Sequence, residues 1–170
     1  MKRFIIGTVM LAGLLVGVFS TPVFAQNIRA ELEGFEEVPA VSSTAKGLFR
    51  GRIRDKGTAI DYTLNYSGLE GTVSQAHIHF GQQGVVGGIS VWLCETTDAF
   101  QDPAGLAPTC PQEGEVKGTL TAANVIGPSG QGIAAQEFDE LIRAIRNGVA
   151  YVNVHSLPTF GGGEIRGHIK

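Results

Sequence analysis

The chain has 170 residues and a formal net charge of −3 at pH 7, a length that suits one domain whose core buries roughly two-thirds of the unfolded surface. Its acidic balance and the absence of a Lys/Arg-rich run argue against nucleic acid as a partner.

The N-terminal segment predicts export. Lys2 and Arg3 precede an apolar, uncharged stretch, and small residues follow up to Ala25. A basic start, a short apolar region and small residues before a cleavage site are typical of a secretory signal peptide. We therefore expect residues 1–25 to be removed, leaving one domain over residues 26–170 that is periplasmic or secreted and has no membrane span. A retained membrane anchor is the alternative, although the apolar run is short for a bilayer.

Most of the remaining chain alternates apolar and polar residues in short stretches between turn residues, which is the pattern of half-buried β-strands. A hairpin is expected across residues 55–57. Trp92 and the phenylalanines are most simply core residues. The predicted strands are 28–35, 47–54, 58–66, 73–80, 88–94, 115–122, 149–155 and 164–169.

One helix is predicted over residues 135–147. Its apolar residues fall on one stripe, and Gly148 follows as a stop signal. Several short strands and one connecting helix indicate a mainly β fold. We expect an antiparallel, Greek-key-like β-sandwich or barrel with one short helix before the penultimate strand.

The four histidines occupy three of the predicted strands. Side chains alternate between the two faces of a strand, so His77 and His79 share a face opposite Ile78. The aliphatic neighbours of His155 and His168 likewise take the core side of their strands. All four imidazoles are therefore expected on faces that point away from the core, which indicates a metal site.

Imidazole nitrogens suit copper or zinc. A structural zinc more often recruits cysteine, so a histidine set favours copper, which can cycle between two oxidation states. Surface histidines without a metal are the alternative. Whether the strand of His77 lies beside those of His155 and His168 stays open at this point.

Arg166 is the next candidate. It lies one same-face step from His168, where its guanidinium could hold an anion beside the metal. An ion pair with Glu164 on the same face is the alternative, and the two roles are compatible.

Cys94 and Cys110 are the two cysteines of the chain. In an exported protein such a pair is usually oxidised, and the bridge would restrict the irregular loop between them. Thiolate ligation of copper or zinc is the weaker alternative, because neither cysteine has a second ligand nearby.

Several segments resemble the CHRD (chordin) domain family, and the resemblance runs from Asn27 to Lys170. Its most specific part is the pair of segments 151–155 and 163–167. The other segments are 36–39, which contains a Glu-Val-Pro element, 76–81 and 87–89.

A more distant likeness concerns function. The strand of His77 and His79 is similar to the His-x-His strand that binds copper in copper-zinc superoxide dismutases. His155, followed by a glycine loop and Arg166, parallels that family's third copper histidine and anion-guiding arginine. The likeness implies copper on the outside of a β-barrel. No histidine is left for that family's zinc site, so one copper ion without zinc is expected, with His168 as the candidate fourth ligand.

The leading hypothesis is therefore an exported copper protein with superoxide dismutase-like activity. Its rival is a non-catalytic extracellular CHRD module that binds a partner without metal. Copper storage or delivery ranks last, because it would call for methionine clusters that the mature chain lacks. Homo-oligomerisation stays open. The assigned residues are Arg166 for the anion and, for the metal, His77, His79, His155 and His168.

Overall fold

The structure, a computed structural model, describes residues 25–96 and 101–170. The predicted signal peptide, apart from Ala25, lies outside them. Within the described residues no helix is long and apolar enough to cross a membrane, and eight strands and one α-helix are found. They are β1 (Gln26–Glu33), β2 (Lys46–Ile53), β3 (Ile60–Ser67), β4 (Thr72–Phe80), β5 (Gly88–Glu95), β6 (Gly114–Leu120), α1 (Phe138–Arg146), β7 (Ala150–Leu157) and β8 (Phe160–His168).

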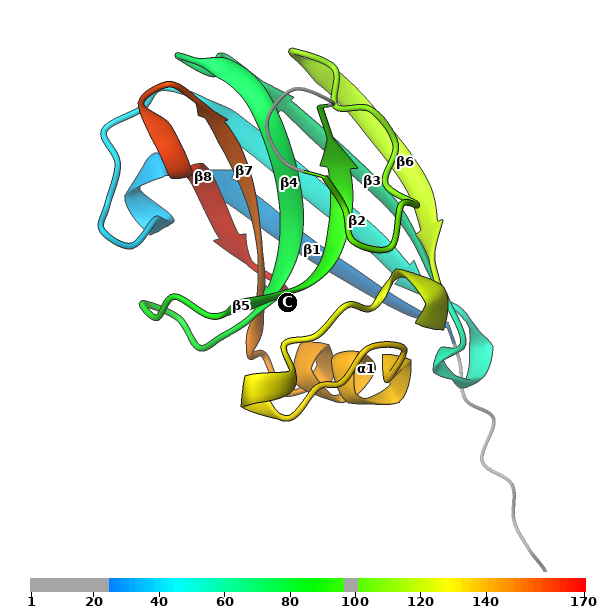
Figure 1. Cartoon of the computed structure of the whole chain (residues 1–170). Helices are drawn as coiled ribbons and strands as arrows, with labels where there is room; N and C mark the ends of the chain where they lie inside the picture. The colour runs from blue at the N-terminus through cyan, green and yellow to red at the C-terminus, as the bar shows by residue number, and fades with distance from the viewer. Residues whose placement is uncertain (1–24, 97–100) are drawn as a thin grey trace, which may run out of the picture.

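All eight strands form one antiparallel sheet in the order β5-β4-β7-β8-β1-β2-β3-β6, which curls into a nearly closed barrel (Figure 1). Several contacts join the β5 end of the sheet to the β3-β6 end. The Tyr62 hydroxyl of β3 donates to Leu93 O of β5 over 2.6 Å, and the Cys94–Cys110 disulfide ties β5 to the segment before β6. The mainly β, antiparallel prediction with one helix before the penultimate strand is confirmed.

The pairing between β1 and β8 is the thinnest part of the barrel. Their ladder consists of one residue pair, Glu33 with Arg166. Beyond it, Arg29 and Lys170 exchange two backbone hydrogen bonds of 2.8 and 2.9 Å. This seam divides the sheet into two four-stranded halves, β5-β4-β7-β8 and β1-β2-β3-β6.

The barrel interior is filled by the apolar residues that alternate along each strand, and α1 covers one end of the barrel (Figure 1). Phe49 and Phe138 lie in this core, as predicted. Phe35 does not, because its side chain is 68% exposed. Trp92 is buried but lies on the opposite face of β5 from the core residues Val91 and Leu93. Trp92 is therefore a buried hydrophobic residue, as predicted, but it packs on the histidine side of the sheet and not in the barrel interior.

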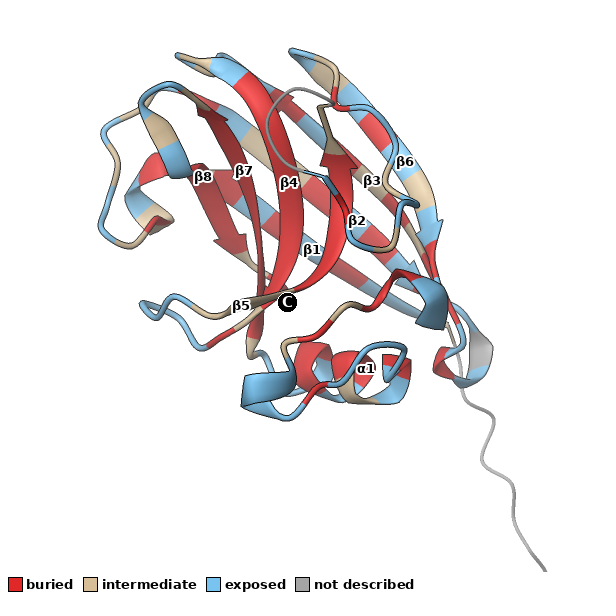
Figure 2. Ribbon diagram, viewed as in Figure 1, coloured by how far each residue is buried: buried red, intermediate tan, exposed pale blue. Residues whose placement is uncertain are grey.

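Burial differs between the two halves of the sheet (Figure 2). On β2, buried and exposed residues alternate, as expected for a strand with one solvated face. On β4 and β7, nearly every residue is buried on both faces. The histidines lie on the face predicted, away from the barrel interior, but His77, His79 and His155 are buried there and only His168 is partly exposed.

Most strand boundaries lie within two residues of the predictions, but two elements begin further away. The helix begins at Phe138, not at residue 135, because Gln136 has a φ of 69°, which a right-handed helix does not accommodate. The last strand begins at Phe160, before the glycine run. The hairpin between β2 and β3 is confirmed, with Lys56 at φ 67° and Gly57 at φ 71° in its turn.

The disulfide makes a testable contribution to stability. Its cysteines are separated by 16 positions in the sequence, and a bridge across a loop of that length stabilises a domain by about 3 kcal/mol. Reduction should lower the free energy of unfolding, measured with urea, by about this amount. A Cys94→Ala/Cys110→Ala variant should not respond to the reductant, and an unchanged wild-type midpoint on reduction would contradict the prediction.

Candidate metal centre

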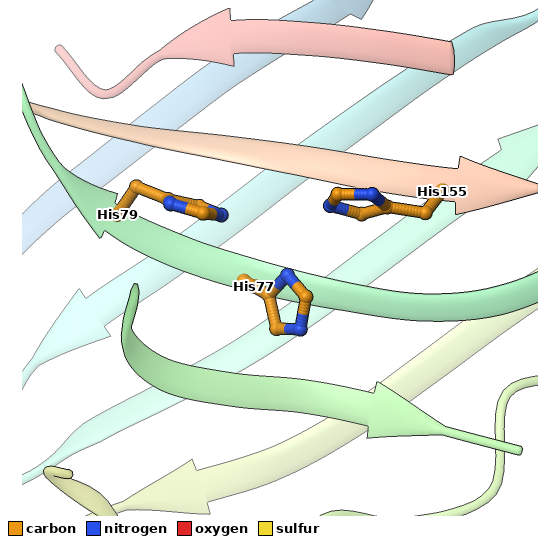
Figure 3. Close-up of side chains that lie close together, drawn as sticks. All are labelled: His77, His79 and His155. Atoms are coloured by element: carbon orange, nitrogen blue, oxygen red, sulfur yellow. The ribbon is translucent and has the colours of Figure 1, made fainter. Parts of the chain in front are cut away.

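Three of the four histidines converge on the outer face of β4 and β7. His77 and His79 lie two residues apart on β4. In the register of β4 with β7, Gln75 is opposite His155, which is therefore one same-face step from His77. The ring centroid of His77 lies 5.3 Å from that of His79 and 5.0 Å from that of His155. His79 and His155 point toward each other, with His77 between them (Figure 3).

Backbone carbonyls fix the orientation of two of these rings. Nδ1 of His79 lies 2.9 Å from Gly87 O, and Nδ1 of His155 lies 2.9 Å from Gly161 O. A carbonyl oxygen can only accept, so Nδ1 carries the hydrogen and donates it in each ring. The lone pair of each neutral imidazole is then on Nε2, as in histidines that ligate metals.

The free nitrogens of the three rings meet the requirements of a metal site. Nε2 of His79, Nε2 of His155 and both ring nitrogens of His77 are buried without a hydrogen-bond partner. One ligand atom from each residue can be chosen so that all three lie within 4.8 Å of one another. Two nitrogens bound to one ion at 2.0–2.1 Å lie at most about 4.2 Å apart, so binding needs a contraction of about 0.6 Å at the widest pair. The trio could hold a metal ion.

The electrostatic surroundings keep the rings neutral. Burial, together with the neighbouring His155 and His79, lowers the pKa of His77 to about 2. Burial also lowers the pKa of His79 to about 4 and is the main cause of the lowered pKa of His155. Neutral imidazoles are the form that binds metal, so the trio does not have to release protons at pH 7 before binding.

Aromatic side chains wall the histidine cluster. Trp92 is paired with His77 across β5 and β4, and their rings meet edge to face at 4.3 Å between centroids. Tyr151 stacks on His79 at 4.7 Å, with an interplanar angle of 4°. These contacts restrict ring rotation and exclude water. Sequence reasoning missed both roles, because they depend on strand register.

The loop between β4 and β5 closes over the site and depends on one glycine. The carbonyl of Gly87 accepts the His79 hydrogen bond, and its backbone N–H donates to the Tyr151 hydroxyl oxygen over 3.2 Å. A Cβ at position 87 would overlap the carbonyl oxygen of Phe80. Glycine is needed here because the backbone passes so close to β4.

Arg166 lies beside the trio, but it is buried. Only 1% of its surface is exposed, Nη2 donates to Val85 O over 2.5 Å, and the guanidinium carbon lies 3.3 Å from the Tyr151 ring centroid. Its positive charge is among the causes that lower the pKa of His79. Arg166 Nε has no hydrogen-bond partner.

The expected ion pair between Arg166 and Glu164 is not found. Among the described residues, Arg166 has no carboxylate oxygen within 4.0 Å of its guanidinium. The Glu164 carboxylate instead accepts hydrogen bonds from the hydroxyls of Ser43 and Ser156 and from the backbone of Glu70. Glu164 therefore ties two loops to β8, and its carboxylate is saturated by neutral donors.

Glu37 is a site residue to which the sequence analysis gave no role. Its side chain is 6% exposed and Oε1 has no hydrogen-bond partner. Burial raises its pKa to about 7, although Arg166 and Asn153 act in the opposite direction. Gly163 makes room for it, because a Cβ there would overlap the Glu37 carboxylate. The one available signal was its place in the Glu-Val-Pro element that carries the family resemblance.

His168 lies on the same face, one strand further along the sheet. It is paired with Tyr151 across β8 and β7, and the two ring centroids are 5.6 Å apart. It is partly exposed, and its ring nitrogens have no hydrogen-bond partner. The structure leaves it outside the group of three ligand atoms.

The lowered histidine pKa values predict acid sensitivity of the metal-free protein. In the unfolded chain each histidine has a pKa near 6.5. In the folded protein the pKa is about 2 for His77 and about 4 for His79. Below pH 6.5 the unfolded state therefore binds more protons, and the free energy of unfolding falls as the pH falls. Glu37 opposes this trend, because its pKa is raised from 4.5 to about 7 when folded.

Between pH 7 and pH 5 the lowered pKa values of His77 and His79 outweigh the raised pKa of Glu37 by about 1.5 kcal/mol of unfolding free energy. The lowered pKa of His155 adds to this loss in the metal-free protein. Urea unfolding in the presence of a chelator at the two pH values measures this loss. Equal stability at both values would show that the rings titrate in the folded state as they do in the unfolded chain.

The comparisons with known proteins agree with the sequence resemblance. The CHRD domain family matches residues 28–169, which is nearly all of the described chain. A search of curated proteins and a search of solved structures found no match. The matched range includes the three converging histidines, the two carbonyl contacts and Arg166. The chain belongs to the CHRD domain family.

Proposed function

We propose that this CHRD-domain protein is an exported copper protein with superoxide dismutase-like activity. The observation that carries the proposal is the convergence of three buried, neutral imidazoles whose free nitrogens have no protein partner. An all-imidazole set suits copper. Both cysteines are joined in a disulfide, so no thiolate is available for the sulfur-containing sites that structural zinc prefers.

The chain's own residues prepare the site for a reaction with one-electron steps. Copper bound there would supply the redox chemistry by which two superoxide ions and two protons become dioxygen and hydrogen peroxide. The carbonyls of Gly87 and Gly161 hold His79 and His155 in the tautomer with a free Nε2. Trp92 holds His77 by its edge-to-face contact. Preorganised ligands limit the rearrangement that each step requires.

Arg166 would attract the anionic substrate. Its charge has no ion-pair partner within 4.0 Å in the described chain. The nearby Glu37 is half protonated at about pH 7, because burial raises its pKa. The positive field at the site is therefore only partly compensated, and such a field raises the local concentration of an anion within an acidic protein. The contact with Val85 O is the one that a bound anion would replace.

Export is supported by two observations. The Cys94–Cys110 disulfide is of the kind that persists in oxidising compartments and is rare in the cytosol. The first 25 residues have the basic start, apolar stretch and small residues of a signal peptide.

Burial favours a second candidate, a non-catalytic CHRD module that binds a partner without metal. His77 is 0% exposed, and His79 and His155 are 7% and 6% exposed. Each of the three rings also packs against another aromatic ring. In this alternative the histidines stabilise the covered face of β4 and β7, and their free nitrogens have no chemical role.

Copper binding to matched histidine variants distinguishes the two candidates. The mature chain should bind one Cu²⁺ whose EPR spectrum shows nitrogen hyperfine structure. His77→Ala should weaken copper binding by more than about a hundredfold. Loss of a residue that only contacts a ligand typically costs less than this, so a larger effect identifies a direct ligand. His168→Ala removes a histidine on the same face and should retain the ion. Equal loss in both variants, or no stoichiometric binding by the wild type, would favour the non-catalytic module.

The role of Arg166 can be tested separately. Arg166→Gln should retain copper but lower the second-order rate constant with superoxide by about tenfold, the lower end of electrostatic steering effects. Arg143→Gln, on the exposed surface of α1, changes the net charge equally and should have little effect. Arg166→Lys should recover part of the rate if the charge is responsible. A rate for Arg166→Gln equal to that of the wild type would remove Arg166 from the proposal.

A further inference from the structure

The outer face of β2 carries a stripe of cations. Four exposed cations lie along this strand and just past its end, separated by two or four positions: Lys46, Arg50, Arg52 and Arg54. Phe49 and Ile53, at odd-numbered positions, point into the barrel. Because strand side chains alternate between faces, these four cations share one side of the sheet. The stripe lies in the half β1-β2-β3-β6, on other strands than His77, His79 and His155.

Two adjoining hollows follow the arginines of this stripe. The larger, of about 660 Å³, is lined by Asn27, Arg29, Arg50, Arg52 and Lys170 among others. The smaller, of about 410 Å³, is lined by Arg52, Arg54 and Asp61 among others. They share Arg52 and Asp61, so they form one elongated groove, here called the arginine groove. Its length suits a chain-like ligand better than a single small ion.

The charges in the arginine groove are unbalanced. Asp61 is its one acidic side chain, and both its carboxylate oxygens are taken by Arg54, over 2.6 and 2.8 Å, with Thr119 donating as well. Among the described residues, Arg50 and Arg52 have no hydrogen bond and no ion pair within 4.0 Å. Arg29 and Arg50 are paired directly across β1 and β2, but Arg29 also forms an ion pair with Glu31. The charges that a bound anion would balance are therefore those of Arg50 and Arg52.

We propose that the arginine groove binds an acidic polysaccharide, a chain bearing carboxylate or sulfate groups. Arg50 and Arg52 would contact the anionic groups, since guanidinium matches both geometries. Asn27 and Thr63, which also line the groove, can hydrogen-bond sugar hydroxyls. This inference does not depend on the proposed function, because the groove and the histidines lie on different strands.

Other polyanions fit the groove less well. A peptide would commonly add to a free strand edge, but β2 is paired on both sides by β1 and β3. A lipid surface would be expected to find apolar anchors. The exposed large apolar residues of the described chain, Phe35, Val85, Val86 and Leu106, do not line the groove. A single-stranded nucleic acid would be expected to find exposed aromatic side chains for base stacking, but the one aromatic residue of the groove, Tyr62, is buried.

The test uses the mature chain and heparin, a sulfated polysaccharide, as the probe. Wild-type protein should bind heparin at low salt and elute in a salt gradient. Arg50→Gln/Arg52→Gln should weaken the affinity measured by calorimetry about tenfold, as expected for two exposed charge contacts. Arg143→Gln/Arg146→Gln on α1 changes the net charge by the same amount and should stay within about twofold of the wild type. Circular dichroism confirms that all the variants are folded.

Three results would overturn the proposal. One is no binding of heparin by the wild type at low salt. Another is equal loss of affinity in the two double variants, which would show that only the net charge matters. The third is tighter binding to vesicles of anionic phospholipid or to duplex DNA than to heparin. None of these measurements uses copper, so they are independent of the outcome at the histidines.

Discussion

The outer face of β4 and β7 is polar and yet buried, and the arrangement of the site follows from that constraint. A buried polar group costs free energy unless it is hydrogen-bonded. The chain meets this requirement with backbone carbonyls, those of Val85 and Gly87 in the β4–β5 loop and that of Gly161 at the start of β8, each of which accepts a hydrogen bond from a site side chain. Each contact satisfies one side of a ring or guanidinium and thereby determines which atoms stay free. The nitrogens left without partners are those that converge.

The covering loops hold this arrangement because very little space separates them from the sheet. Glycine is required at position 87 and at position 163, where a side chain would collide with Phe80 O or with the Glu37 carboxylate. Glu164 adds a second kind of attachment, a buried carboxylate that joins Ser43 and Ser156. The close backbone contacts and the hydrogen bonds of Glu164 together hold the covering segments in a fixed position on the sheet.

Sequence reasoning predicted what depends on local periodicity and missed what depends on register. Alternation along the chain was enough to place His77 and His79 on one face and to identify most strands. It could not show that loops cover this face, since those loops come from distant parts of the chain. The contacts of Trp92 with His77 and of Tyr151 with Arg166 require strand pairings that no local pattern encodes. The cations of β2 were overlooked for a related reason, because alternate positions do not form a run in the sequence.

The thin seam between β1 and β8 has a consequence for how this domain can change over time. On one side of it, β4 and β7 have no solvated face, so nearly every substitution there disturbs packing or the hydrogen bonds around the histidines. On the other side, the exposed positions of β2 contact solvent, and substitutions at such positions usually alter stability little. Substitutions can therefore change the binding properties of the β1-β2-β3-β6 surface without disturbing the histidine cluster. One sheet therefore carries a covered face on which substitutions are costly and a solvated face on which they are tolerated.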